Sequence, residues 1–373
     1  MVNKGKIVIS AINFFEGGPL SVLKDCLSYI NDSRYATEYT FIALVHKTEL
    51  FDKNQFKNIE FIPFPKSRSS YIYRLYYEYF YFKKFARVND VSFWLSLHDI
   101  SPSLKNIRQA VYCHNPSPFN SINYADIYIQ PTQFLFRLFY KYLYRINIHK
   151  NKYVIVQQLW MKNKFIEMFH LNKNEVIVAP PEISKIPNFF FRSQTSDIKR
   201  VTTFFFPTFP RPFKNLELLG KAAKLVRQRN ADFKIIITID GSENKYAQSI
   251  YNQFKSVKNI EFVGLINRDE VYEQYSLADC LIFPSKLETW GLPISEFKQF
   301  GKPILASNLP YAREAVGDYE KVNFFDPKNP LELAELMLKF LDGSLVYDGN
   351  SSTIYDGLHV KGWDNLFKIL LND

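Results

Sequence analysis

The chain has 373 residues, more than one typical hydrophobic core organises, so two domains are the natural expectation. Its 47% hydrophobic and 23% charged residues are those of an ordinary globular protein, and its sequence lacks the run of about 18 apolar residues needed to cross a membrane. The three cysteines, Cys26, Cys113 and Cys280, lie far apart in apolar settings. This spacing argues against a disulfide framework or a cysteine metal site and fits a reducing cytosol.

The net charge of +10 and the aromatic content of 17% are both high. Such a charge favours an anionic partner, which would be nucleic acid, an acidic membrane surface or a phosphorylated substrate; it also arises from a lysine-rich composition that merely keeps a protein soluble. The apolar run Ile7–Ile12 is too short for a signal peptide. We therefore expect a cytoplasmic protein, or one held peripherally on the inner face of the cytoplasmic membrane.

The first half of the chain alternates short apolar runs, typical of strands, with amphipathic stretches typical of helices. Lys6–Ile12 is predicted as the first strand, and a helix with apolar residues at helical spacing follows Pro19. Between them, Gly17 and Gly18 allow either a close approach of a phosphate to the backbone or a plain tight turn. Further strands are predicted at Tyr39–Val45, Ile59–Pro63, Phe93–Leu97, Ala110–Cys113, Tyr153–Gln157 and Val176–Ala179, with a helix at Met161–Phe169.

Two segments of this half combine aromatic and basic residues to an unusual degree. Tyr71–Val88 is predicted to be a helix because Arg74 and Glu78 lie four residues apart, and Phe134–Ile146 has the pattern of an amphipathic helix with a basic stripe. Two interpretations remain open. The segments are either ordinary outer helices with aromatic faces in the core, or helices that lie on anionic lipid with aromatic rings at the headgroup level.

The segment 180–196 mixes proline, serine and polar residues and is the best domain boundary. The alternation of strands and helices then begins again, with a helix starting at Leu216 that Asn215 is expected to cap. Strands are predicted at Val201–Phe206, Ile235–Asp240, Ile260–Val263, Cys280–Phe283 and Pro303–Ala306, with helical stretches near Asn244–Phe254, Arg268–Leu277, Leu292–Phe300, Tyr311–Val316 and Pro330–Phe340. A final helix is predicted around Trp363–Leu371. The repeated pattern predicts two Rossmann-like α/β domains whose sites lie at the carboxyl ends of parallel strands.

The stretch from Cys280 to Gly301 concentrates candidate ligand-binding residues. Glu288 lies between the predicted strand and helix, and Glu296 lies one turn inside the helix that Gly291 and Pro293 open. Two carboxylates beside a helix N-terminus suit a ligand that carries both hydroxyls and phosphate. Lys214, on the first loop of the second domain and three residues after Arg211, supplies a cation for the same phosphate.

These motifs resemble those of the retaining glycosyltransferases of family 4, which have the GT-B fold. FPSKLETWGLPISEF resembles the signature of that family, with its two glutamates, and FFFPTFPRPFKNLELL resembles its phosphate loop, with Lys214-Asn215 at the lysine position. FVGLINRDEVYEQYSLADCLIFPS is similar to the family's approach to the signature, CHNP resembles its His-Asn-Pro in the first domain, and VIVQQLWMKNKF also matches. The resemblance covers essentially the whole chain.

The resemblance implies an α/β GT-B architecture of two Rossmann-like domains facing across a cleft. We expect an acceptor-binding domain at residues 1–182, a linker at 183–200, a nucleotide-sugar-binding domain at 201–350, and a C-terminal helix in 351–373 that packs back on the first domain. The implied activity is that of a retaining hexosyltransferase. Its partners would be a nucleotide sugar and a lipid-linked or oligosaccharide acceptor, in bacterial O-antigen, capsule or other surface-polysaccharide biosynthesis.

By resemblance, the donor site lies in the second domain. Glu288 would contact hydroxyls of the donor sugar and Glu296 would hold the nucleotide ribose. Four residues between them would turn backbone amides toward the sugar and phosphate: Thr289, Trp290, Gly291 and Leu292.

The resemblance also implies the residues closest to the bond that breaks. Lys214 would stabilise the diphosphate leaving group, with Gly17 and Gly18 closing over it, and His114 would lie near the reacting carbon on the acceptor side. Relatives often carry an arginine several residues before the lysine, near Thr208 here, and Arg211 is the candidate to replace it. Fixed cations aimed at the departing diphosphate lower the barrier without a metal.

No cofactor or metal is expected, because the donor sugar is a substrate and the sequence has no Asp-any-Asp pair to hold a divalent ion. Two other functions stay open. The charge of +10 and the aromatic residues beside Lys and Arg would also suit a non-catalytic basic protein that binds membrane or nucleic acid, although no nucleic-acid motif occurs and we expect no such partner. A sugar epimerase with the same fold is the other alternative.

Overall fold

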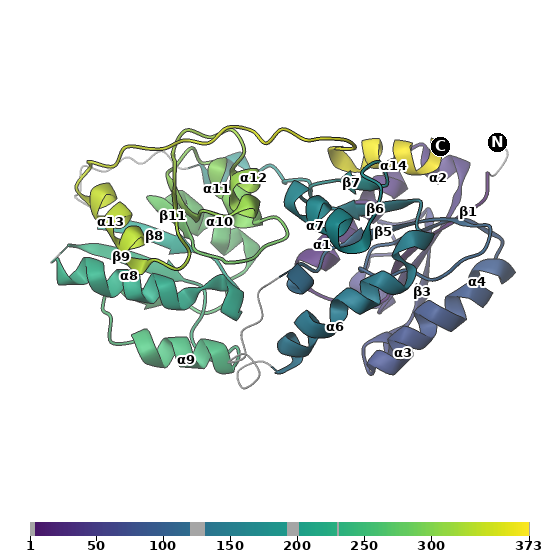
Figure 1. The fold of residues 1–373 in the computed structure, drawn as a ribbon, viewed down its shortest axis with the longest axis horizontal. Helices are drawn as coiled ribbons and strands as arrows, with labels where there is room; N and C mark the ends of the chain where they lie inside the picture. The colour runs from purple at the N-terminus through teal and green to yellow at the C-terminus, as the bar shows by residue number, and fades with distance from the viewer. Residues whose placement is uncertain (1–3, 120–130, 192–200, 230, 373) are drawn as a thin grey trace. The chain divides into compact units, whose positions relative to one another are not determined.

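The computed structural model describes residues 4–119, 131–191, 201–229 and 231–372. The chain divides into two compact units: unit 1 comprises Met1–Glu182 and Tyr355–Asp373, and unit 2 comprises Ile183–Ile354. Each unit is built around one sheet of parallel strands with helices on both faces (Figure 1). The predicted pair of Rossmann-like α/β units is therefore confirmed.

The sheet of unit 1 has seven strands in the order β3-β2-β1-β4-β5-β6-β7. Its strands are β1 (Lys6–Ala11), β2 (Thr40–Val45), β3 (Ile59–Pro63), β4 (Val91–Ser96), β5 (Arg108–Cys113), β6 (Tyr153–Val156) and β7 (Val176–Val178). The order reverses between β1 and β4, which makes the carboxyl ends of these two strands a topological switch point. Ligands of doubly wound sheets bind at such a switch point.

Helices cover both faces of this sheet because alternate strand residues point to opposite sides. On one face, the apolar stripe of α1 (Gly17–Asp32) packs with α14 (Gly362–Asn372). On the other face lie α4 (Phe82–Val88), α6 (Pro131–Asn147) and α7 (Leu159–Phe169). The remaining short elements of unit 1 are α2 (Tyr35–Glu38), η1 (Thr48–Leu50), η2 (Pro65–Ser67), η4 (Ser117–Phe119) and η5 (Ile148–Lys150).

The segment predicted as one helix at 71–88 contains a π-helical turn. It consists of α3 (Tyr71–Tyr76), the π-helical η3 (Tyr77–Tyr81) and α4. Its fully or nearly buried side chains recur every four residues, at Arg74, Glu78, Phe82 and Ala86. In an α-helix with 3.6 residues per turn, such a repeat drifts by about 40° at each step. The wider π turn absorbs this drift and keeps the four side chains on the buried face.

The sheet of unit 2 has six strands in the order β10-β9-β8-β11-β12-β13. Its strands are β8 (Thr202–Phe206), β9 (Phe233–Ile237), β10 (Ile260–Phe262), β11 (Cys280–Phe283), β12 (Ile304–Ser307) and β13 (Val322–Phe325). The order reverses between β8 and β11, which makes their carboxyl ends the second switch point. The edge strand β13, four residues long, was not predicted from the sequence.

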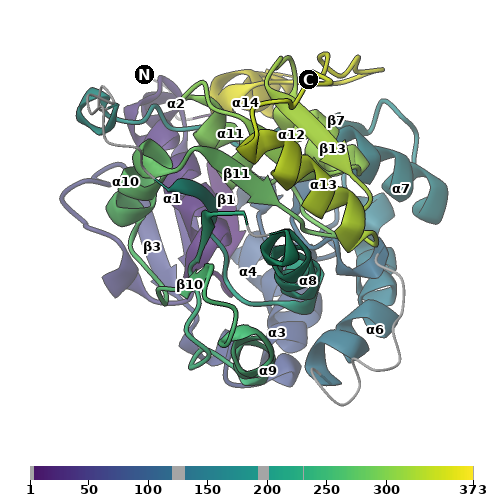
Figure 2. The ribbon, with the colours of Figure 1, turned by 90° about the vertical axis from the view of Figure 1, so that its left-hand side faces the viewer.

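The helices of unit 2 are α8 (Leu216–Gln228), α9 (Lys245–Phe254), α10 (Arg268–Leu277), α11 (Leu292–Lys298), α12 (Pro310–Val316) and α13 (Pro330–Leu341), with 3-10 turns η6 (Asn188–Phe190) and η7 (Pro212–Lys214). Figure 2 shows α8 beside α13, with which it packs. Residues 183–191, expected as part of a linker, pack on this unit: the Ile186 N–H donates to Gln299 Oε1, and Phe190 contacts Tyr272. Residues 192–200 lie outside the described residues. Within the described ranges, none of the helices combines the length and the apolar composition needed to span a bilayer.

Candidate active site

Two loops meet at the switch point of unit 2, one after β8 and one after β11. Because these strands are parallel neighbours, their carboxyl ends lie side by side. The Lys286 N–H donates to the Phe213 carbonyl at 2.7 Å, and Asn215 Nδ2 donates to the Pro284 carbonyl at 3.0 Å. These bonds fix the β8 loop against the β11 loop.

Asn215 does not cap α8 with its side chain, so the prediction that it caps this helix was wrong. Asn215 stands at the position before α8, but its backbone has φ 60° and ψ 40°, the left-handed conformation that asparagine tolerates better than most residues. Its side chain donates to the carbonyls of Pro284 and Pro327 instead of capping the helix. Asn215 therefore joins three loops, a role that its local sequence did not indicate.

Lys214 and Glu288 form an ion pair at the centre of this arrangement. Lys214 Nζ lies 2.6 Å from Glu288 Oε1, and the two side chains are only 16% and 14% exposed. The rings of Phe213 and Phe283 each lie 5.7 Å from the ammonium. Limited water access leaves the charges weakly screened, so the pair combines a strong cation with a carboxylate that accepts hydrogen bonds from hydroxyls. The structure thus brings together two of the predicted site residues.

The signature loop continues through Gly291 into α11. Gly291 has φ 93°, a conformation that residues with a Cβ rarely adopt, and Pro293 follows in the first turn of the helix. Trp290 is anchored by its indole N–H, which donates to Ser295 Oγ at 3.0 Å. Thr289 and Leu292, which flank these two residues, are half-buried. The predicted opening of the helix is correct, although α11 ends two residues earlier than expected.

Glu296 forms a second charged pair. Its Oε2 accepts from the Tyr275 hydroxyl at 3.1 Å and its Oε1 from the Arg268 guanidinium at 3.3 Å. Burial raises the pKa of Glu296, while Arg268 and Tyr275 oppose that shift. Sequence reasoning missed both partners. They lie on α10, and only the packing of α10 against α11 brings them to the carboxylate.

The two positions considered for an additional phosphate-binding arginine differ in their surroundings. Thr208 is buried. Its backbone N–H donates to the Thr238 hydroxyl oxygen at 2.7 Å, and the Thr238 hydroxyl donates to the Thr208 carbonyl at 2.8 Å. Arg211 is half-buried at the start of η7, with its guanidinium 5.0 Å from the Phe209 ring. The role of Arg211 toward a phosphate stays a prediction.

In unit 1, His114 follows β5 at the carboxyl edge of the sheet. Its ring stacks on Tyr112 at a centroid distance of 4.4 Å, and Gln157 Nε2 lies 3.4 Å from Nδ1. Burial lowers the pKa of His114 to about 4, so the imidazole is neutral near pH 7. Its Nε2 makes no hydrogen bond to any described residue. His114 therefore presents an uncharged nitrogen.

Asp99 organises the turn that carries His114. Its Oδ1 accepts from the backbone N–H groups of His114 at 2.6 Å and Asn115 at 3.0 Å. The hydroxyls of Tyr140 and Tyr144 on α6 also donate to this carboxylate, at 2.9 and 3.0 Å. Asp99 has φ 75°, a left-handed conformation that aspartate tolerates better than most residues. Its role as the anchor of His114 was missed.

A second buried polar group lies at the switch point of unit 1. His98 Nε2 is 3.1 Å from both Ser10 Oγ and Glu78 Oε1, and all three side chains are buried. The Arg74 guanidinium donates to the His98 carbonyl at 3.0 Å. Burial by itself would lower the pKa of Arg74, but the neighbouring tyrosine and carboxylates raise it, so the guanidinium stays charged. The π-helical turn is what carries Glu78 inward to this group.

Gly17 and Gly18 lie at the start of α1, which begins at Gly17 itself rather than after a glycine loop. A Cβ at either position would meet no described heavy atom within 4 Å. Both residues are exposed. They and His114 belong to unit 1, so their approach to Lys214 stays a prediction.

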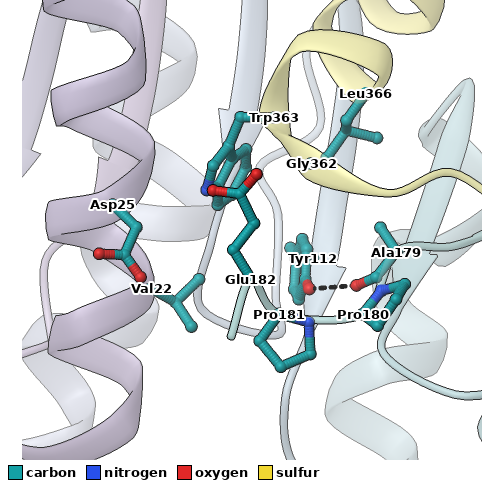
Figure 3. A pocket seen from close by; sticks show the side chains of 10 residues that line it. All are labelled: Val22, Asp25, Tyr112, Ala179, Pro180, Pro181, Glu182, Gly362, Trp363 and Leu366. Carbon is teal, nitrogen blue, oxygen red and sulfur yellow. Dashed lines mark hydrogen bonds between the residues drawn. The ribbon is translucent and has the colours of Figure 1, made fainter. Parts of the chain in front are cut away.

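Figure 3 shows a small cavity of unit 1 where residues 179–182 pass between α1 and α14. The Tyr112 hydroxyl donates to the Ala179 carbonyl at 2.6 Å, and the carboxylates of Asp25 and Glu182 flank the space beside Trp363. Its volume of about 20 Å³ accommodates little more than one water. A sugar does not fit there. Within the described residues, three or more His, Cys, Asp or Glu side chains do not gather anywhere in a way that could hold a metal ion.

The unit that contains Lys214, Glu288 and Glu296 matches a known protein family. Residues 189–350 match the family model described as Glycosyl transferases group 1. These residues form a Glycosyl transferases group 1 domain. The ion pair and the signature loop therefore lie inside the matched region, at the kind of switch point where doubly wound sheets generally bind their ligands.

Curated relatives match parts of the chain. An uncharacterised glycosyltransferase of Methanocaldococcus jannaschii is 26% identical over 162 residues, which are 43% of this chain and 41% of the relative. The O-antigen chain mannosyltransferase RfbU of Salmonella typhimurium is 21% identical over 223 residues, 59% of this chain and 57% of that protein. The D-inositol 3-phosphate glycosyltransferase of Pseudarthrobacter chlorophenolicus is 24% identical over 168 residues, 43% of this chain and 32% of that protein. The chain thus spans between a third and somewhat more than half of the length of these relatives.

Solved structures resemble nearly the whole chain. A glycosyltransferase from Rickettsia africae superposes with a TM-score of 0.64 at 15% identity, over 92% of this chain and 89% of its own. The lipopolysaccharide outer core galactosyltransferase WaaB gives 0.63 at 13% identity, over 91% and 90%. Anabaena HepE in complex with UDP and glucose gives 0.60 at 14% identity, over 91% and 90%. Likeness at this identity shows the fold alone, and the predicted GT-B fold class is confirmed.

Proposed function

We propose that the protein is a glycosyltransferase that moves a sugar from a nucleotide-sugar donor to a hydroxyl of a lipid-linked or oligosaccharide acceptor. The observation that carries the proposal is the Lys214–Glu288 ion pair at the switch point of the group 1 domain. RfbU is described as an O-antigen chain mannosyltransferase, and HepE was solved in complex with UDP-glucose. These relatives support a role in the biosynthesis of bacterial surface polysaccharide.

The charges of the site suit the rupture of a sugar–phosphate bond. Negative charge develops on the departing diphosphate, and a preorganised cation stabilises it most where water is scarce. Lys214 is such a cation. A diphosphate that bound to its ammonium would replace the carboxylate of Glu288, which would then accept hydrogen bonds from hydroxyls of the sugar. The exchange leaves neither charge without a partner.

The remaining roles follow from the surroundings of each residue. Glu296, held by Arg268 and Tyr275, accepts hydrogen bonds from the ribose hydroxyls of the donor. His114, neutral and anchored through its backbone by Asp99, offers Nε2 to a hydroxyl near the reacting carbon. We propose retention of anomeric configuration by the resemblance to family 4, and a reaction that needs no metal because Lys214 and Arg211 supply the cationic charge.

The test is transfer and hydrolysis with a panel of UDP-, GDP- and dTDP-sugars, with and without EDTA. Lys214→Ala and Glu288→Gln are compared with Lys221→Ala, an exposed lysine on α8 that serves as the control. The proposal expects the first two variants to lose activity, the control to keep it, and EDTA to have no effect. Full activity in both site variants would overturn the assignment. Anomeric analysis of the product by NMR tests retention and separates transfer from epimerisation.

A further inference from the structure

The outward face of the segment 71–88 carries large apolar side chains that face solvent. Ile72 is 78% exposed, Tyr76 51% and Phe80 70%. They recur at the same four-residue interval as the buried residues, so the π-helical turn that aligns the core side also aligns this stripe. Tyr76 and Phe80 stack with ring centroids 6.4 Å apart. Exposed apolar patches of this kind mark interaction surfaces in soluble proteins.

A basic groove continues the stripe. Phe80 lines it together with Lys83, Lys84 and Arg87 of α4, and Lys105 contributes from the loop before β5. Its volume is about 460 Å³, and Leu104 and Ile107 are half-buried in its apolar part. All four basic side chains are exposed, and within the described residues none forms an ion pair. The only acidic residue in the lining is Asp90, so the groove is strongly cationic.

The helix α6, on the same face of the sheet, repeats this combination. Phe139, Tyr142 and Ile146 are each more than half exposed, and Lys141 and Arg145 are exposed beside them. Figure 1 shows α3, α4 and α6 along one side of unit 1. The sequence left two interpretations of these helices open. The one that places their aromatic faces in the core is incomplete, because each helix also exposes aromatic rings to solvent.

We propose that this face, defined as the stripe Ile72–Tyr76–Phe80 with the groove beside it and the exposed side of α6, docks on an anionic lipid bilayer. Tyrosine rings favour the level of the headgroups, aliphatic and phenyl groups favour the acyl boundary, and Lys and Arg favour acidic headgroups. Each basic residue near an acidic surface strengthens binding about fivefold. Single-stranded nucleic acid would use the rings for stacking but would gain nothing from the exposed Ile72 and Ile146.

The groove lies at the amino ends of β4 and β5, because it includes Val91 and the loop before Arg108. His98 and His114 lie at the opposite, carboxyl ends of the same strands. The groove is therefore separate from the candidate active site, and the helices that carry the rest of the docking surface reach that site only through buried side chains such as Arg74 and Tyr140. This proposal does not rest on the proposed reaction, and either can fail without the other.

The experiment is co-sedimentation of the full chain with vesicles of phosphatidylglycerol and phosphatidylcholine, and with phosphatidylcholine alone, over a range of salt. One triple variant carries Lys83→Glu, Lys84→Glu and Arg87→Glu, and an apolar double variant carries Tyr76→Ser and Phe80→Ser. The matched control carries Lys221→Glu, Lys224→Glu and Arg227→Glu, three exposed basic residues of α8 in unit 2. The two triple variants remove the same net charge.

We expect binding to the acidic vesicles only, weakened about a hundredfold in the α4 triple variant. The apolar double variant should also bind more weakly, and the α8 control should bind as the unmodified chain does. Equal loss in the two triple variants would show that net charge alone is responsible and would overturn the proposal. So would self-association through the stripe, or nucleic-acid binding without vesicle binding. Thermal unfolding and nucleotide-sugar binding, unchanged in all three variants, separate docking from folding and from the donor site.

Discussion

The carboxyl edges of the two sheets use charge in different ways. In unit 2, Lys214 pairs with Glu288 and Arg268 pairs with Glu296, side chain to side chain, and the pairs retain some access to solvent. In unit 1, Asp99 is satisfied by two backbone N–H groups and two tyrosine hydroxyls. The side-chain ion pairs of unit 2 can exchange a partner for a charged group of a ligand. The Asp99 carboxylate of unit 1 instead holds the backbone in one conformation.

This contrast suggests a division of labour between the units. Under the proposed function, the edge of unit 2 offers a cation to a phosphate and carboxylates to hydroxyls. The edge of unit 1 holds the neutral imidazole of His114 on a turn that Asp99 fixes. Removing a charge should therefore cost activity in unit 2 and stability in unit 1, and the following predictions test that difference.

The largest effect is expected for Lys214→Ala. Loss of a preorganised group that stabilises a developing anion lowers the catalytic rate by about 10² to 10³. Stability should fall much less than activity, because the 14% of the Glu288 side chain that stays exposed lets water replace part of the lost pairing. Turnover with the best donor and urea unfolding measure the two quantities. A variant that unfolded more easily but turned over normally would erase the contrast between the units.

Asp99→Ala should show the opposite result. It removes the acceptor of two backbone N–H groups and of the Tyr140 hydroxyl, and leaves the Tyr144 hydroxyl only the Asn115 carbonyl at 3.2 Å, which should lower the free energy of unfolding by about 3 kcal/mol or more. Asp99→Asn is the matched control, because asparagine tolerates the positive φ and keeps an acceptor oxygen. Urea unfolding of both variants gives the comparison. Equal, small losses would mean that the carboxylate is not what holds the turn.

The neutral ring of His114 predicts a dependence of stability on pH. Its folded-state pKa of about 4 is below the ordinary value near 6.5, so the unfolded chain binds the proton first as pH falls. The contribution is complete above about pH 6.5 and is lost as pH falls toward 4, by about 1 to 3 kcal/mol. His114→Gln should unfold with a flatter pH profile between pH 7 and 5. Identical profiles would show that the ring titrates normally.

The smallest effects are expected at glycines. Gly291→Ala forces a Cβ into the left-handed region at φ 93° and should cost about 1 to 2 kcal/mol. Gly18→Ala, in the first turn of α1 and with space around it, should be neutral or stabilise by up to about 1 kcal/mol. Thermal unfolding measures both. A destabilised Gly18→Ala would show that the start of α1 is more constrained than its open surroundings indicate.

Local patterns were sufficient for most of the fold and for half of the candidate site. Strands and helices alternate because apolar residues recur at their periods, and the motif that carries Glu288, Gly291 and Glu296 is continuous in sequence. The missed edge strand β13 is only four residues long, too short for its apolar residues to show a clear period. The π-helical turn was also not predicted, although the residues that prove to be buried recur every four positions from Arg74 to Ala86, a spacing that favours such a turn.

The sequence by itself determined which residue types stand at the ends of which strands: Lys214 after β8, Glu288 after β11 and His114 after β5. Tertiary structure decided their partners. Lys214 meets Glu288 across 74 residues only because β8 and β11 are neighbours in the sheet. Asp99 reaches the tyrosines of α6 for a similar reason. Hydrogen bonds and ion pairs act over a few ångströms in space and not along the chain, so sequence spacing nominates such groups but the packing of strands and helices pairs them.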